Sequence, residues 1–267
     1  MMNMGRFKNT YFVVLLVALF FMSGCVTEST RNGQPYEPVE RQVDKEKIAK
    51  DYAALADGYM RNGDRENALR AINKGLKINP DSGEIRNILA FYYNSDGETE
   101  LAEREFRNAI SADSKYTATY MNFGVFLYNN SRYEEACRMF EKAANDVMYN
   151  KRDDAFVNLG RCYSKQKQNA KADEVYERAL MHNFRNSAAQ LELAESYFEK
   201  GEFDKSQKFY NEYLRFGQQS PKTLWLGIRL AHVSGDQDRE ASYALFLKNQ
   251  YPDSNEYAEY QRWKALN

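Results

Sequence analysis

The feature that most constrains the fold is a repeat with a period of 34 residues that starts at Ala49. The clearest unit is 120–143, where apolar residues recur every three or four residues on both sides of the Asn129-Asn130-Ser131 turn. This spacing predicts two short helices joined by a tight turn. A helix pair this short cannot bury its own apolar face, so it requires neighbouring copies. Six units align, starting at residues 49, 83, 117, 153, 187 and 221.

Four positions of the unit carry the pattern. The eighth and twentieth are small where two helices must approach closely, and the seventh and twenty-fourth are large and apolar. For the first five units the eighth residues are Ala56, Ala90, Gly124, Gly160 and Ala194, and the twentieth are Ala68, Ala102, Ala136, Ala172 and Ser206. The seventh are Leu55, Leu89, Phe123, Leu159 and Leu193, and the twenty-fourth are Ile72, Phe106, Phe140, Tyr176 and Tyr210.

The repeat is that of tetratricopeptide proteins. It predicts an all-α fold, a right-handed superhelix of about six tetratricopeptide repeats over 44–254, with first helices lining a concave groove. The sixth unit fits poorly, and shifting its first helix by one residue puts Leu226, Gly227 and Leu230 on the pattern. Residues 255–267 carry a loose apolar stripe, which we interpret as a capping helix; a membrane-surface helix is the alternative, with a weak cationic face.

The N-terminal 24 residues predict a signal peptide that is not part of the fold. Arg6 and Lys8 precede a twelve-residue apolar run, 11–22, which is too short to span a bilayer. The run ends in Met-Ser-Gly-Cys, which resembles a bacterial lipoprotein signal in which Cys25 is lipidated, for example with palmitate, and becomes the N-terminus. An ordinary secretory signal beside an incidental cysteine is the alternative. Val26, in place of an aspartate, implies outer-membrane sorting.

Residues 25–43 are interpreted as the lipidated cysteine and a flexible tether. The segment is rich in Thr, Ser, Gln, Glu and Pro, and 18 such residues reach about 20–25 Å. Without the signal the chain keeps 35 basic and 38 acidic side chains, a net charge of −3. No basic excess or cluster indicates nucleic-acid binding.

Units three and four resemble a known family in more than the generic repeat. Asn122-Phe-Gly-Val-Phe-Leu127 and Arg132-Tyr133-x-Glu135-Ala136 are similar to segments of the PilF/PilW type IV pilus biogenesis lipoproteins. The likeness continues through an irregular connection that stretches the period to 36, with Tyr149, Arg152, Ala155, Asn158, Gly160 and Cys162. With the signal, tether and six repeats, the resemblance covers essentially the whole chain.

The resemblance implies a secretin pilotin. Such a protein would be lipid-anchored to the outer membrane on its periplasmic side, bind pilus secretin subunits and promote their localisation and assembly. The alternative is a periplasmic scaffold lipoprotein that recruits peptidoglycan hydrolases or outer-membrane assembly machinery. Neither interpretation requires a cofactor, a metal or a small-molecule substrate, and neither is an enzyme.

Groove positions are informative because the core does not dictate them. The predicted partner-binding residues are Phe91, Asn94, Met121, Val125, Tyr128, Val157 and Arg161. Apolar side chains there favour a partner's apolar segment, and packing under the tether or at a superhelix bend is the alternative. Repeat five is acidic instead, with Glu192, Glu195 and Glu199; this predicts either contact with a basic partner or a solvated face.

No catalytic constellation emerges from the sequence. His182 and His232 lie far apart, and neighbouring acidic pairs on a helix do not face each other. Cys137 and Cys162 fall at inward positions of adjacent repeats. Buried free thiols are the default interpretation, and a disulfide is the alternative in an oxidising compartment.

Overall fold

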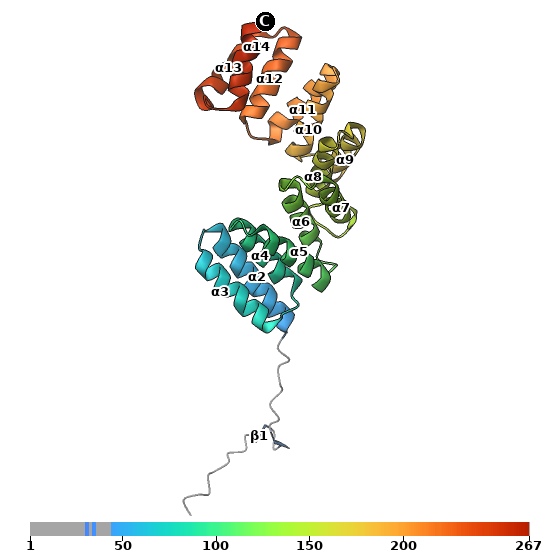
Figure 1. The fold of residues 1–267 in the computed structure, drawn as a ribbon. Coiled ribbons are helices and arrows are strands. Elements are labelled where there is room, and N and C mark those ends of the chain that lie inside the picture. Colours follow the sequence, from blue (N-terminus) through green and yellow to red (C-terminus); the bar gives the residue numbers. More distant parts are fainter. Residues whose placement is uncertain (1–29, 32–33, 36–43, 267) are drawn as a thin grey trace, which may run out of the picture. The chain divides into compact units, whose positions relative to one another are not determined.

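The computed structural model describes residues 30–31, 34–35 and 44–266 (Figure 1). Two short strands, β1 (Thr30–Arg31) and β2 (Gln34–Pro35), pair antiparallel. The predicted signal peptide, Cys25 and most of the tether lie outside the described residues. From residue 44 the chain is helical. The helices are α2 (Lys45–Arg61), α3 (Arg65–Ile78), α4 (Gly83–Ser95), α5 (Thr99–Ala112), α6 (Thr117–Asn129), α7 (Tyr133–Asn145), α8 (Arg152–Lys165), α9 (Asn169–His182), α10 (Ser187–Glu199), α11 (Phe203–Phe216), α12 (Pro221–Ser234), α13 (Gln237–Gln250) and α14 (Asn255–Leu266).

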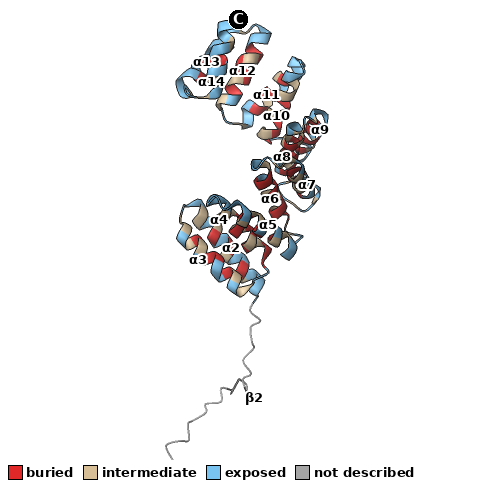
Figure 2. Cartoon of the chain, in the orientation of Figure 1, coloured by how far each residue is buried: buried red, intermediate tan, exposed pale blue. Residues whose placement is uncertain are grey.

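The helices pair as the repeat predicts, α2 with α3 through α12 with α13. Neighbouring first helices also contact each other, through backbone proximity in most cases and through the Arg161–Glu192 ion pair between α8 and α10. Buried residues recur in successive helices and do not gather at one centre (Figure 2). The all-α tetratricopeptide superhelix with a C-terminal helix is therefore confirmed. In the part of the chain described, no helix is long and apolar enough to cross a membrane.

The turn inside each repeat requires a left-handed backbone at its fifteenth residue. Gly63, Gly97, Gly201 and Gly235 have φ between 73° and 77° there. Repeats three and four use Ser131 and Lys167, at φ 60° and 62°. Both residues adopt a backbone conformation that glycine adopts most readily, because the packing of the two flanking helices determines the turn.

The core forms where the twenty-fourth residue of one repeat meets the seventh of the next. The rings of Phe106 and Phe123 stack with centroids 5.3 Å apart. Leu55, the seventh residue of the first repeat, departs from this core contact, because its side chain is 46% exposed. Leu55 belongs to the first repeat, so no preceding second helix supplies a partner for it.

The small eighth residue is explained by close helix contact. A Cβ atom built on Gly124 would lie 2.6 Å from Cε1 of Phe140, whose ring packs directly against the glycine. Tyr176 packs in the same way against Gly160. Within these two repeats, glycine allows an aromatic ring to lie against the backbone of the first helix.

The alternative interpretation of the cysteines is the one observed. Cys137 on α7 and Cys162 on α8 form a disulfide, with Cα atoms 5.6 Å apart. The bond joins repeats three and four across the irregular connection, where the two-residue insertion lies.

The shifted alignment of the sixth repeat also holds for its first helix. Leu226 and Leu230 belong to one buried cluster with Ala194 and Tyr210 of repeat five. The second helix, α13, keeps the unshifted alignment, because Ala244 and Leu247 are its buried residues.

Candidate protein-binding groove

Side chains of successive first helices enclose two clefts. The N-terminal cleft, of about 440 Å³, lies among α2, α4, α6 and two inter-repeat connections. The central cleft, of about 470 Å³, lies among α6, α8, α10 and α12. The N-terminal cleft is lined by Lys50, Ala53, Ala54, Asp57, Arg61, Glu84, Asn87, Ile88, Phe91, Tyr116, Ala118, Asn122, Tyr149 and Lys151. The central cleft is lined by Tyr128, Arg161, Ser164, Lys165, Glu192 and Lys222.

The floor of the N-terminal cleft combines amides with an aromatic ring. Asn122 Nδ2 donates to Asn87 Oδ1 at 3.2 Å, which links α6 to α4. Asn87 is 2% exposed, so this bond fixes a buried amide. Phe91 is half-buried, with its ring edge-on to the core ring of Phe106 at 5.8 Å. The cleft thus offers an apolar surface beside fixed polar groups, a combination suited to a peptide segment.

The rim of this cleft is partly desolvated. Burial raises the pKa of Tyr116 to about 12, and burial also raises the pKa of Tyr149. Burial raises the pKa of the Glu84 carboxyl, against the opposing effect of Lys50. Both phenols therefore stay neutral at physiological pH and can donate hydrogen bonds to a bound chain.

The central cleft is organised by ion pairs between neighbouring first helices. Arg161 Nε contacts Glu192 Oε1 at 2.7 Å, and Lys222 Nζ contacts Glu195 Oε2 at 2.8 Å. Burial acts to lower the pKa of Lys222, but Glu192 and Glu195 outweigh it, so the pKa is raised. Burial raises the pKa of Tyr128, whose ring lies edge-on to Tyr133 at 5.2 Å.

Ion pairs within the chain account for the three glutamates of the fifth repeat. Glu192 and Glu195 are paired as above, and Glu199 Oε1 accepts from Arg229 Nη1 at 3.1 Å. Each predicted acidic group on α10 therefore has a cation from α8 or α12. The face is neutralised within the chain, which removes the charge argument for a basic partner.

The predicted groove residues separate into four groups. Phe91 lines the N-terminal cleft, and Tyr128 and Arg161 line the central one. Asn94 and Val125 are exposed, and Met121 is half-buried; they line neither cleft. Val157 is 2% exposed and belongs to the core, so its prediction as a groove residue is wrong.

The reason lies in how first helices pack side by side. A fifth residue faces the sixth residue of the next repeat, as Asn87 faces Asn122. In the same way Asn158 Nδ2 lies 3.8 Å from the sulfur of Met121. Val157 is also a fifth residue, so it falls in the contact between helices and not on their open side.

Some cleft residues were not predicted as binding residues. Tyr116, Tyr149 and Lys151 come from connections between repeats, and Lys165 and Lys222 come from the end of α8 and the start of α12. The repeat alignment assigned roles only within helices, so it gave these connections no role. The irregular spacing around Tyr149 was the available signal.

The histidines pack against aromatic rings. His182 stacks on Phe156 with centroids 5.4 Å apart. His232 lies edge-on to Trp263 at 4.7 Å, and its Nδ1 is 3.2 Å from Glu240 Oε2. Within residues 44–266, no group of three or more His, Cys, Asp or Glu side chains is placed to hold a metal ion.

Comparison with known proteins identifies the same repeat and a relative that spans nearly the whole chain. Tetratricopeptide repeat models match residues 53–117 and 165–224. The type IV pilus assembly protein PilF of Pseudomonas aeruginosa is 35% identical over 243 residues, which cover 91% of this chain and 94% of the relative.

Two solved structures agree with this relationship. The structure from a functional characterisation of Pseudomonas aeruginosa PilF superposes with a TM-score of 0.77 at 35% identity, covering 82% of this chain and 98% of that one. PilW, described as a widely conserved type IV pilus biogenesis factor, gives a TM-score of 0.70 at 26% identity, covering 80% and 98%. The chain therefore belongs to the PilF/PilW family of tetratricopeptide-repeat proteins of type IV pilus biogenesis.

Proposed function

We propose that this chain acts in type IV pilus biogenesis as a non-catalytic outer-membrane lipoprotein that binds secretin subunits. It promotes their localisation and assembly in the outer membrane. The observation that carries the proposal is the correspondence with PilF, a type IV pilus assembly protein, over 91% of the chain. The groove supports a binding role, because its clefts combine half-buried aromatic rings with fixed amides and paired charges.

In the proposed mechanism, a secretin segment lies along the first helices and contacts both clefts. Phe91 provides apolar contact area in the N-terminal cleft, and the half-buried Asn122, held by its bond to Asn87, offers its amide oxygen to peptide backbone. Tyr128 and Arg161 provide a phenol and a guanidinium in the central cleft. A few central anchors usually carry most of the affinity of such an interface.

The groove test uses one variant per cleft, Phe91→Ala and Tyr128→Ala, and the double variant. We expect secretin multimers in the outer membrane to fall in each single variant and to be lost in the double. Phe246→Ala is the matched control, because this exposed aromatic residue of α13 lines neither cleft. Circular dichroism melting confirms folding. Normal multimer levels in a folded double variant would place the binding surface elsewhere.

The anchoring part of the proposal has its own test. Cys25→Ala removes the only proposed lipid attachment point, so we expect a folded protein that leaves the outer-membrane fraction. Metabolic labelling with a palmitate analogue should mark the wild-type chain and not the variant. An unlabelled wild-type chain, or a variant that fractionates normally, would contradict lipid anchoring and leave the groove test unaffected.

A further inference from the structure

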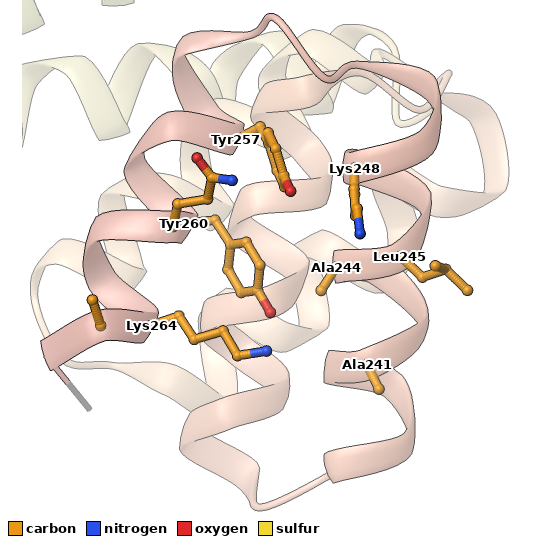
Figure 3. A pocket seen from close by; sticks show the side chains of 9 residues that line it. Ala241, Ala244, Leu245, Lys248, Tyr257, Tyr260 and Lys264 are labelled. Atoms are coloured by element: carbon orange, nitrogen blue, oxygen red, sulfur yellow. The ribbon is translucent and has the colours of Figure 1, made fainter.

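A third cleft, of about 560 Å³, lies at the C-terminal end between α13 and α14 (Figure 3). It belongs to neither groove cleft. Figure 3 shows Tyr260 and Lys264 extending from α14 toward α13, and Lys248 entering the same space from α13. The cleft is lined by Ala241, Ala244, Leu245, Lys248, Tyr257, Tyr260, Gln261, Lys264 and Ala265.

The helix α14 occupies the place of the first helix of a seventh repeat. Its start at Asn255 follows the sixth repeat start by 34 residues. Tyr260 of α14 meets Trp225 of α12, with ring centroids 6.2 Å apart. This contact joins neighbouring first helices, as the Asn122–Asn87 hydrogen bond does in the earlier repeats.

The cleft exists because α13 carries a small residue where the earlier second helices carry a large one. Ala244 holds the twenty-fourth position, where the preceding five repeats have large side chains that are at most 2% exposed. Gln261 of α14 is polar and exposed. Both residues line the cleft, so the space that an aromatic ring fills elsewhere is open here.

The charges around this space have one sign. Lys248 and Lys264 line the cleft, and none of its nine lining residues is acidic. Neither ammonium forms a salt bridge with a carboxylate in the described part of the chain, although Lys264 Nζ lies 5.8 Å from the Tyr260 ring centroid. Lys248 stands where the other repeats have Leu76, Ile110, Ala144, Leu180 and Leu214, so this charge replaces a regular apolar residue.

We propose that this C-terminal cleft docks an acidic amphipathic helix of a partner protein. The partner's apolar side chain would fill the space beside Ala244 and Tyr260, and its carboxylates would pair with Lys248 and Lys264. The helix would pack against α13 and α14 as a further helix of the stack does. Charge complementarity selects an acidic partner, because a basic helix would meet two like charges.

The test measures binding of labelled synthetic helices by fluorescence anisotropy. One probe carries a leucine stripe flanked by glutamates, and its matched probe carries lysines in place of the glutamates. The full-length chain is used in detergent, with protein-free micelles as the blank. We expect the acidic probe to bind about tenfold more tightly than the basic one, with affinity falling as salt rises.

Charge reversal gives the decisive variant. Lys248→Glu combined with Lys264→Glu should reverse the preference between the probes, while the control Lys208→Glu, at an exposed lysine of α11, should leave it unchanged. Ala244→Phe should fill the cleft and abolish binding of both probes. Equal binding of the two probes by the wild type, or an unchanged preference after reversal, would overturn the proposal.

The remaining occupant to distinguish is a second copy of the chain. Light scattering of the wild type should give a monomer. A dimer that the double reversal converts to a monomer would show that this face pairs with itself, and would overturn a separate acidic partner.

Discussion

Glycine at the eighth position of repeat three gives the sharpest test of the packing. In Gly124→Leu, the Cβ atom alone would stand 2.6 Å from Cε1 of Phe140 and 2.7 Å from Cδ1. Phe140 is 1% exposed, so its ring has no open space into which to move. Overpacking of this kind costs about 1–3 kcal/mol. With roughly 2–4 °C per kcal/mol for a chain of this size, the melting temperature should fall by about 2–12 °C.

The matched control is the same substitution at Gly58 on α2. A Cβ atom there meets nothing within 4 Å. Leucine is a better helix former than glycine by roughly 0.8 kcal/mol, so Gly58→Leu should melt at or slightly above the wild-type temperature. Both variants are followed by circular dichroism at 222 nm, a standard helix signal.

The two variants together separate the effect of packing from the effect of the backbone. A Gly124→Leu protein that melts with the wild type would refute the close contact between α6 and α7. A Gly58→Leu protein that loses as much would show that glycine acts through the backbone and not through packing. A Phe140→Leu background should reduce the cost of Gly124→Leu, because the two residues share one contact.

Two further predictions concern covalent and electrostatic stabilisation. Reducing the Cys137–Cys162 disulfide should lower the free energy of unfolding by about 2–4 kcal/mol. Urea denaturation with and without reductant measures this difference. An unchanged denaturation midpoint, in a chain shown to be oxidised before reduction, would contradict the prediction. Hydrogen bonds from Arg132 lower the pKa of Glu103 and Glu135 from 4.5, so their stabilising contribution is present above that value and is lost as the pH falls through the lowered folded-state pKa. Arg132→Gln should therefore destabilise the chain at pH 7 and converge on the wild type as the pH falls below the lowered folded-state pKa values, whereas a constant difference would exclude the ion pairs.

The left-handed turns show which local conformations the repeat pattern predicts. Glycine at the fifteenth position predicts a turn between the helices of a repeat, and Gly63, Gly97, Gly201 and Gly235 adopt it. Ser131 and Lys167 adopt the same left-handed conformation, although serine and lysine do not favour it. The turn is set by the packing of the two helices, so the pattern of the repeat predicts it better than the single residue does.

The candidate groove was less predictable, because side chains from several repeats build it. Spacing along one helix placed Phe91 and Tyr128 on its open side, and both line clefts. Val157 has the same spacing but lies under a neighbouring helix. Val157 is a fifth residue and lies in the contact between first helices, whereas Phe91 and Tyr128 are ninth and twelfth residues, so the outcome depends on the neighbouring repeat.

The sequence by itself determined the all-α class, the number of repeats, the small and large core positions, and the family. These follow from local spacing, because each helix needs a face of fixed period and each pair needs a copy beside it. Only the tertiary structure decided the disulfide, the neutralisation of the acidic repeat by Arg161, Lys222 and Arg229, and the open cleft beside Ala244. Each of these features requires contacts between side chains of different repeats. The repeat pattern describes what the units share, so it does not predict contacts between residues that differ from one unit to the next.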